Sequence, residues 1–268
     1  MKQKFLFLQF VYSSSCIYLC SFCILFAVSC KSFSPFSKTE LKTLEQEYGI
    51  QAGSLWKSPN VDKHCALIVS SESVPFAKLV YGKNGGFLSY LRSHNLTSYV
   101  YTPKKDASPS LLTEDLNSIT RRMKSDCSFL YLGGLRDSSN LIVSFLNQSG
   151  FRSLKVFFLG EGFDYEYKKF QVFMPGYTPI PLTLRNDKTP IPNTVQFDTL
   201  FITGKLDSVA PEESVVPYVM RYRIANRSKT IYQEISSVAG FFDANDSDLY
   251  MHEDAKEVWN VVVSFLKD

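Results

Sequence analysis

The sequence predicts an α/β fold with a doubly wound, mostly parallel sheet and helices on both faces. Short apolar runs alternate with segments of helical periodicity, and this order favours parallel strands joined by crossover helices. Several runs are apolar at consecutive positions, as in strands that are buried on both faces. Beyond the first 30 residues about 238 remain, which suits one domain with one substantial core. The predicted strands are 65–71, 98–102, 128–134, 154–160, 199–204 and 230–235.

A helix is predicted over 37–49, in the stretch SKTELKTLEQEYG. Ser37 and Glu40 have the spacing of a capping box, and Gly49 is a natural helix stop. Two more helices are predicted from apolar residues that share one helical face. The first face consists of Leu112, Leu116, Ile119 and Met123, and the second of Val258, Val261, Val262, Phe265 and Leu266.

The N-terminus has the features of an export signal. Its only charges are two lysines near the start, and an uncharged run follows from residue 5 to Cys30. This run ends in FAVSCKS, which resembles a bacterial lipobox, although Ala27 stands where leucine is commoner. The resemblance implies cleavage before Cys30 and lipidation of its sulfur.

We therefore predict three parts of the chain. Residues 1–29 are a signal peptide, 30–37 a lipidated tether, and 38–268 a single domain with a proline- and aromatic-rich insertion at 161–197. The alternative at the N-terminus is an uncleaved anchor helix. In both cases we expect an exported protein that is anchored to a membrane of the bacterial cell envelope.

Cysteine and histidine usage gives no sign of a metal site or of a disulfide framework. Four of the six cysteines lie in the leader, and Cys65 and Cys127 each begin an apolar run, so we expect buried free thiols. The three histidines are scattered along the chain, and no C-x-x-C or H-E-x-x-H pattern is present. We expect no metal and no cofactor.

The charge of the chain argues against nucleic acid as a partner. Without the two leader lysines, 27 basic residues face 26 acidic residues, which leaves a net charge near +1. Electrostatic binding to a phosphate backbone needs a marked basic excess.

The insertion at 161–197 interrupts the strand–helix alternation. Prolines at 175, 179, 181, 190 and 192 forbid a long helix there. The segment is also aromatic, with Tyr165, Tyr167, Phe170, Phe173 and Tyr177. We expect an irregular lid over the carboxyl ends of the strands, with aromatic side chains that roof a pocket. The alternative is a surface flap.

Three stretches resemble the α/β-hydrolase family, with some features of its dienelactone-hydrolase branch. TLFITGKLDSVAPEES (199–214) is similar to the late strand that carries the triad acid, with Asp207 and Pro211 at the matching spacing. VAGFFDANDSDLYMHEDAKEVWNVVVSFL (238–266) resembles the last strand, the histidine loop and the closing helix. FLYLGGLRDSS resembles the nucleophile turn. The resemblance covers 61–267 and implies the family's fold.

The residues that would carry the family's chemistry differ. With Gly133 as the first glycine of G-x-S-x-G, Leu135 takes the nucleophile position and Asp137 that of the second glycine. Phe241 stands where the histidine is expected, and the oxyanion loop at 70–76 lacks the usual histidine–glycine pair. A serine hydrolase needs a nucleophile, a base and an acid, and of these only Asp207 remains.

A relocated site is an alternative. Ser138 begins the helix after the turn, and His252 could serve as its base if the preceding loop folds under it. The simpler interpretations are a helix cap for Ser138 and an exposed helix start for His252.

The sequence therefore predicts a membrane-tethered lipoprotein with an α/β-hydrolase-like fold and an inactive site. Its partners would be the membrane, through the lipid anchor, and a small apolar ligand or another protein, but not nucleic acid. One alternative is an active esterase or acyl hydrolase that uses a relocated serine. A second alternative is an envelope scaffold that uses only its surface.

Overall fold

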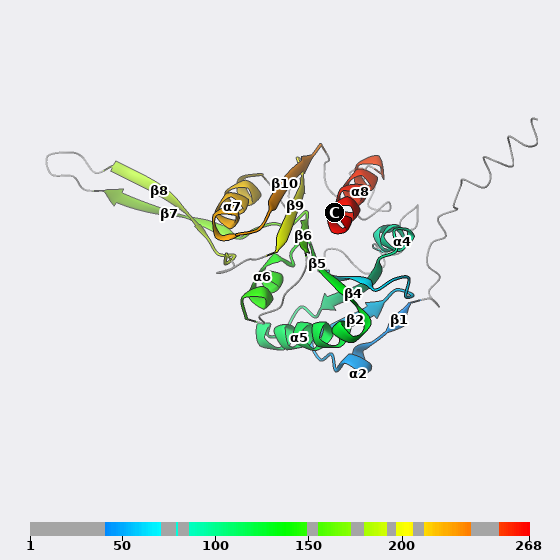
Figure 1. The fold of residues 1–268 in the computed structure, drawn as a ribbon. Helices are drawn as coiled ribbons and strands as arrows, with labels where there is room; N and C mark the ends of the chain where they lie inside the picture. The colour runs from blue at the N-terminus through cyan, green and yellow to red at the C-terminus, as the bar shows by residue number, and fades with distance from the viewer. Residues whose placement is uncertain are drawn as a thin grey trace, which may run out of the picture. The chain divides into compact units, whose positions relative to one another are not determined.

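An eight-stranded sheet forms the centre of the fold (Figure 1). The computed structural model describes residues 41–70, 79, 86–148, 155–172, 180–191, 197–205, 212–236 and 252–268. The strands of the sheet are β1 (Lys42–Thr43), β2 (Gly53–Lys57), β3 (His64–Val69), β4 (Thr97–Pro103), β5 (Phe129–Leu135), β6 (Lys155–Leu159), β9 (Asp198–Gly204) and β10 (Thr230–Ile235).

The strand order is β1-β2-β4-β3-β5-β6-β9-β10. The six strands from β4 to β10 run parallel, whereas β2 is antiparallel to both β1 and β4. All six predicted strands are present within one or two residues of their predicted bounds. The sequence analysis did not predict β1 and β2, the two strands whose pairing is antiparallel.

Helices cover both faces of this sheet, as expected for a doubly wound fold (Figure 1). The short helix α2 (Glu45–Tyr48) packs on one face together with α5 (Pro109–Asp126), α6 (Ser139–Gln148) and α7 (Glu212–Ala225). The other face is covered by α4 (Gly86–Ser93) and α8 (His252–Lys267). The predicted apolar faces of α5 and α8 are those that the sheet buries.

Burial on both faces explains why the strands are apolar at consecutive positions. In β3, Leu67 and Val69 point into the core under α5 and α6, and Ala66 and Ile68 point into the core under α4 and α8. All four side chains are fully buried. The continuous apolar run is therefore the signature of a strand between two helical layers.

The predicted helix over 37–49 is much shorter in the structure. Its described part consists of β1 and the four-residue helix α2. Gly49 does end this helix, with the left-handed φ of 66° that glycine accepts readily. β1 replaces the predicted helix because its two residues pair with the end of β2.

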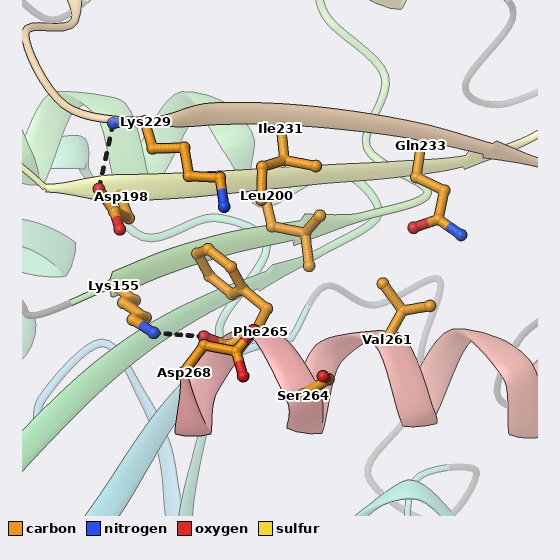
Figure 2. A pocket seen from close by; sticks show the side chains of 10 residues that line it. All are labelled: Lys155, Asp198, Leu200, Lys229, Ile231, Gln233, Val261, Ser264, Phe265 and Asp268. Carbon is orange, nitrogen blue, oxygen red and sulfur yellow. Dashed lines mark hydrogen bonds between the residues drawn. The ribbon is translucent and has the colours of Figure 1, made fainter.

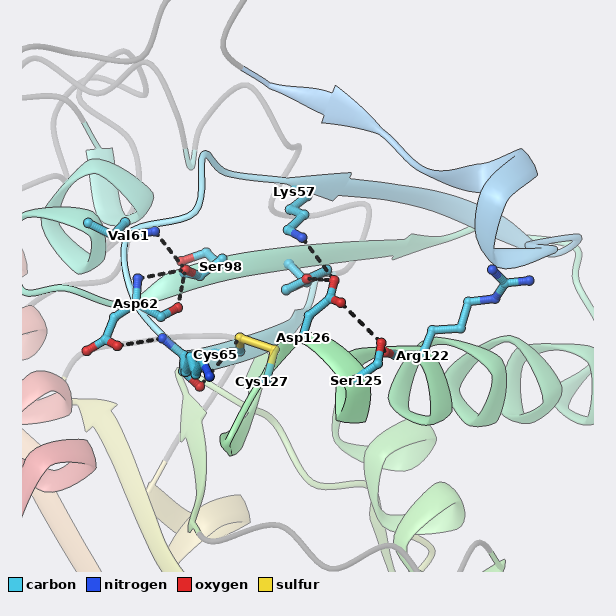
Figure 3. Close-up of a disulfide and its surroundings, with 12 residues drawn as sticks. Lys57, Val61, Asp62, Cys65, Ser98, Arg122, Ser125, Asp126 and Cys127 are labelled. Carbon is cyan, nitrogen blue, oxygen red and sulfur yellow. Dashed lines mark hydrogen bonds and ion pairs between the residues drawn. A yellow bond between two sulfur atoms is a disulfide. The ribbon is translucent and has the colours of Figure 1, made fainter.

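A disulfide joins Cys65 in β3 to Cys127, which follows α5 (Figure 3). The Cα atoms are 5.8 Å apart, within the usual range for a bridged pair. The prediction of two free thiols is therefore wrong. The two cysteines are 62 residues apart in sequence; they meet because α5 returns the chain to the end of the sheet where β3 begins.

The insertion at 161–197 contains regular structure, so the prediction of an irregular segment is wrong. β7 (Tyr165–Val172) pairs antiparallel with β8 (Ile180–Asp187) in a separate two-stranded ribbon. The ribbon follows the carboxyl end of β6 and extends away from the eight-stranded sheet beside α7 (Figure 1). The side chains of the aromatic residues named in the lid prediction lie outside the described residues, so their direction stays a prediction.

The predicted signal peptide, Cys30 and the tether lie outside the described residues. None of the helices in the described ranges is long and apolar enough to span a membrane.

Candidate functional site

The centre of the candidate site is the turn between β5 and α6. Leu135, the last residue of β5, is fully buried. The next residue, Arg136, has a φ of 63°, in the left-handed region that non-glycine residues rarely occupy. Its backbone N–H donates to the Leu159 carbonyl at 3.1 Å and extends the pairing of β5 with β6 by one residue. The sharpest point of the turn is therefore Arg136.

This position shifts the match to the G-x-S-x-G pattern by one residue. In that pattern the nucleophile occupies the strained position between strand and helix. With Arg136 there, Gly134 is the first glycine and Ser138 takes the place of the second. If the pattern is aligned on this backbone angle, Arg136 takes the nucleophile position and Leu135 precedes it; the alignment on Gly133 places Leu135 there.

Two glycines let the chain pack closely before this turn. A Cβ on Gly133 would lie 2.1 Å from the ring of Phe157, and a Cβ on Gly134 would lie 2.8 Å from a carboxyl oxygen of Glu161. The contact at Gly133 is too short for any side chain, because the Phe157 ring is fully buried; at Gly134 the neighbouring side-chain ends would have to shift. Gly134 in particular makes room for a polar cluster below the turn.

That polar cluster consists of Ser138, Ser139 and Glu161. The Ser138 hydroxyl accepts from the Leu135 N–H at 2.9 Å and donates to the Glu161 carboxyl. The backbone N–H of Ser139, the first residue of α6, donates to the other oxygen of this carboxyl at 2.9 Å. Glu161 therefore caps α6 from the loop after β6. The predicted capping role of Ser138 is replaced by hydrogen bonds back to β5 and across to Glu161.

Glu161 is a buried acid, exposed by only 1%. Burial raises the pKa of its carboxyl well above the ordinary value, and the hydrogen bonds from Ser138 and Ser139 oppose this shift only in part. Both carboxyl oxygens are already engaged at the start of α6, one by the Ser138 hydroxyl and the other by the Ser139 N–H.

A pocket of about 640 Å³ lies beside the turn. Its lining comes from the carboxyl ends of β3 and β4, represented by Ser70 and Pro103, from the amino end of α5, and from one side of α6 as far as Gln148. Asp137 and Ser138 form part of the wall. The carboxyl edge of a parallel sheet is where open α/β folds bind ligands. All described lining residues lie between 70 and 148, so the ribbon of β7 and β8 contributes none of them.

The lining of this pocket is mixed in character. Apolar contacts are available from Leu112, Leu141 and the two prolines 103 and 109, and hydroxyl groups from Ser70, Ser110, Thr113, Ser138 and Ser144. Lys104 and Lys105 supply positive charge at one side. Within the described residues no group of three or more His, Cys, Asp or Glu side chains is placed to hold a metal ion.

The structure does not test the whole predicted site. Asp207 and Phe241 lie outside the described residues. His252 is the first residue of α8, but its side chain is outside the described part. The proposed approach of His252 to Ser138 therefore stays a prediction.

The sequence analysis missed Arg136 and Glu161. The first was missed because two adjacent glycines, Gly133 and Gly134, allow two registers of the turn, and only the backbone angle selects one. The signal for Glu161 was present: a lone carboxylate between Gly160 and Gly162, directly after a buried apolar strand.

A second pocket, of about 420 Å³, lies at the opposite edge of the sheet (Figure 2). Leu200, Ile231, Val261 and Phe265 line it with apolar surface between β9, β10 and α8. Polar atoms at this pocket include the Lys155 ammonium, which donates to the Phe265 carbonyl at 2.5 Å. β6 and β9 begin at this second pocket and end near the β5–α6 turn. The two pockets are therefore separated by the length of these strands.

Comparison with known proteins identifies the fold. No protein-family model matches the chain, and no curated protein matches it in sequence. Among solved structures, an α/β-hydrolase enzyme, MGS-M1, from a deep-sea metagenome library of the Medee basin is similar with a TM-score of 0.57 and 12% identity, over 80% of this chain and 91% of that one. The fold is that of the α/β-hydrolases.

Two further solved structures are similar to this chain in fold. An esterase from Pyrococcus furiosus gives a TM-score of 0.56 at 12% identity, over 88% of this chain and 92% of that chain. A protein from Klebsiella pneumoniae that is assigned as a dienelactone hydrolase gives 0.53 at 12% identity, over 81% and 94%. At such low identity the likeness concerns the fold alone, and the site must be judged on its own residues.

Proposed function

We propose that this chain is an exported, membrane-tethered protein with an α/β-hydrolase fold that binds a ligand without hydrolysing it. The observation that carries the proposal is Arg136 at the sharpest point of the turn after β5. A guanidinium stays protonated and cannot attack a carbonyl, so the position that presents the nucleophile in this fold has no nucleophile here.

The pocket at the carboxyl edge supports a binding role. It is large enough for a small organic molecule, and its lining offers apolar contacts together with several hydroxyl groups. A ligand with an apolar body and a few hydrogen-bonding groups fits this composition. Lys104 and Lys105 favour a ligand that carries negative charge at one end.

The disulfide supports export. Disulfides persist in oxidising compartments and are rare in the cytosol. The bridge between Cys65 and Cys127 therefore agrees with the export signal that the sequence predicts. Lipid attachment at Cys30 rests on the sequence of the leader alone. Labelled fatty acid should enter the full chain and not the Cys30→Ala variant; absence of label from the full chain would leave an uncleaved anchor helix as the tether.

An esterase with a relocated nucleophile is the second candidate, because the Ser138 hydroxyl belongs to a residue that lines the pocket. The full chain should be treated with a fluorophosphonate probe and assayed on short acyl esters. We expect no labelling and no hydrolysis above background. Stoichiometric labelling that disappears in Ser138→Ala or His252→Ala, but remains in Ser144→Ala, would overturn the binding proposal and establish the esterase.

A further inference from the structure

The edge of the sheet where the parallel strands begin carries exposed apolar and basic side chains, together with the exposed acids Asp62 and Asp126. We call this the amino-edge surface and define it by Val61, Lys63, Phe129, Arg223, Ile224, Arg227 and Lys229, all exposed. We propose that the amino-edge surface docks on an anionic lipid bilayer and keeps the pocket beside the β5–α6 turn on the side away from the membrane. The proposal rests on the membrane tether proposed above.

Apolar exposure is concentrated at this edge. Five large hydrophobic side chains of the described residues are exposed, and three of them, Val61, Phe129 and Ile224, belong to the amino-edge surface. Ile224 is 88% exposed, on the last turn of α7. The Phe129 ring is stacked on His64 with 4.3 Å between ring centres, so it is held at the edge of the sheet. Apolar side chains that project from a folded edge can insert between lipid head groups.

The charge around Ile224 matches an anionic surface. From Ser214 to Lys229 the chain has four basic residues and no acidic residue. Two acidic residues, Asp198 and Asp268, line the pocket beside Lys229. One carboxyl oxygen of Asp198 accepts from the backbone N–H of Lys229 at 3.1 Å (Figure 2). Basic residues close to an anionic membrane are attracted to its surface.

Hydrogen bonds from Asn226 hold the backbone of the turn that carries these residues. The buried Asn226 side chain donates to the Phe197 carbonyl at 3.3 Å and to the Thr230 hydroxyl at 2.9 Å. Its own oxygen accepts from the Ser228 N–H. These bonds fix the turn between α7 and β10, so Arg227 and Lys229 are presented from a defined backbone.

The second pocket opens on the same edge. Figure 2 shows Lys229 and Ile231 side by side along β10, with Leu200 of the neighbouring strand β9 below them. An apolar hollow with a lysine beside it complements a lipid, whose acyl chains and anionic head group require both kinds of contact.

The predicted tether also approaches this edge. Lys42 in β1 pairs with Lys57, the last residue of β2, which pairs in turn with Tyr99 near the start of β4. The described chain thus enters the sheet close to the amino edge. Cys30 lies eleven residues before Leu41, a span of about 40 Å at most when fully extended. A lipid on Cys30 would keep this edge near the bilayer.

Depth-dependent quenching in vesicles tests the proposal. Full-length Ile224→Trp and Leu111→Trp are reconstituted into phosphatidylcholine vesicles with brominated acyl chains, with and without phosphatidylglycerol. Leu111 is the matched control, because it is an exposed hydrophobic residue at the carboxyl-edge start of α5. After subtraction of the wild-type signal, we expect quenching at 224 to exceed that at 111 by at least about twofold, and only in the anionic vesicles.

Charge reversal provides the second arm. Arg223→Glu/Arg227→Glu in the Ile224→Trp chain should abolish the additional quenching. Lys169→Glu/Lys205→Glu, which makes the same change of net charge at exposed positions away from this edge, should leave it intact. Hydrogen exchange of the unmodified chain should show slower exchange for 220–229 on anionic than on neutral vesicles.

The outcomes separate the surface from the tether. Equal quenching at 224 and 111, or quenching that does not depend on lipid charge, overturns the docking surface. If the protein still floats with neutral vesicles in that case, the tether proposal stands. Flotation only with anionic vesicles, together with quenching at 224, overturns the tether and supports the surface. No flotation with either kind of vesicle overturns both.

Discussion

The Ser139 amide donates to the Glu161 carboxyl at 2.9 Å, and this bond ties the first residue of α6 to the loop that follows β6. The same loop makes further contacts: the Ser139 hydroxyl donates to the Gly162 carbonyl at 3.0 Å, and the Phe163 N–H donates to the Ser214 hydroxyl at 2.9 Å. The loop therefore joins β6, α6 and α7 at the edge where the candidate site lies.

Glu161 should make the stability of the protein depend on pH. Burial raises the pKa of this carboxyl above its ordinary value of 4.5, so the folded state holds a proton that the unfolded state releases. The stabilisation is complete below about pH 4.5 and is lost as the pH rises through the folded-state pKa. Glu161→Gln keeps a neutral side chain, so the free energy of unfolding should fall less with rising pH than in the wild type. Urea unfolding at several pH values measures this.

A control separates the charge of Glu161 from its hydrogen bonds. Glu161→Ala removes the acceptor of the Ser138 and Ser139 bonds and should cost about 1–3 kcal/mol at every pH. If Glu161→Gln has the same pH dependence as the wild type, then Glu161 is not the group that titrates.

Gly133→Ala should destabilise the fold strongly. The new Cβ would lie 2.1 Å from the ring of Phe157, which is fully buried between β6 and the helices α4 and α8. The ring cannot move without disturbing the core, so we expect a loss of about 3 kcal/mol or more in the free energy of unfolding.

Gly49→Ala is the control for Gly133→Ala. Gly49 has a left-handed φ but no heavy atom within 4 Å of a built Cβ. Its substitution should therefore cost only the backbone strain, about 1 kcal/mol. Equal losses at both positions would contradict the close approach of β5 and Phe157.

The disulfide should contribute substantially to stability. It closes a long loop between β3 and the end of α5, and loss of such a bridge typically costs about 2–5 kcal/mol. The full chain with Cys65→Ala/Cys127→Ala should unfold at lower urea concentration than the wild type. Dithiothreitol should lower the urea midpoint of the wild type but not that of the variant. An equal decrease in both would show that dithiothreitol does not act through this disulfide.

Asp115 should fix the start of β2 to α5. Its buried carboxyl accepts from the backbone amides of Gln51 and Ala52 at 2.9 and 2.8 Å, and from the Tyr101 hydroxyl at 2.9 Å. Burial and the Asp115 charge raise the pKa of Tyr101, so its hydroxyl stays a donor. Asp115→Asn turns an acceptor into a donor that faces these groups, and we expect a loss of about 1–3 kcal/mol.

Tyr101→Phe provides the comparison for Asp115→Asn. It removes one of the three donors to the carboxyl and leaves both backbone bonds in place. Its cost should be about 1 kcal/mol and clearly smaller than that of Asp115→Asn. Thermal unfolding of the two variants and of the double variant would show non-additive losses if the three groups act together.

The sequence predicts the parallel part of the fold well, for a physical reason. β3, β5, β6 and β9 are buried under helices on both faces, so their apolar runs are distinct from everything around them. β2 was missed because its five residues, GSLWK, alternate between buried and half-buried positions and include a glycine and a lysine. β7 and β8 were missed because prolines suggested irregular structure, whereas a two-stranded ribbon has free edges that accept proline.

The candidate site was harder to predict, because its parts meet only in the folded chain. Ser138 and Glu161 are 23 residues apart and touch because β5 and β6 are neighbours in the sheet. The Cys65–Cys127 disulfide is hidden in the sequence for the same reason, because the two cysteines meet only in the folded chain. No local pattern reports a contact between residues from different strands.

The last prediction concerns the turn itself. If the site lacks hydrolase chemistry, Arg136→Ser should not create it, although this substitution places a hydroxyl at the strained position of the family pattern. A serine there would still need a base to take its proton. Glu161, the nearby buried acid, is already bound by Ser138 and Ser139 through both carboxyl oxygens, and Ser138 occupies the place of the second glycine. We expect no ester hydrolysis and no fluorophosphonate labelling. The control is Arg136→Gly, which accepts the left-handed backbone readily but carries no nucleophile. Labelling of Arg136→Ser but not of Arg136→Gly would show that a base and an oxyanion site survive in this chain, and that the arginine alone keeps a hydrolase silent.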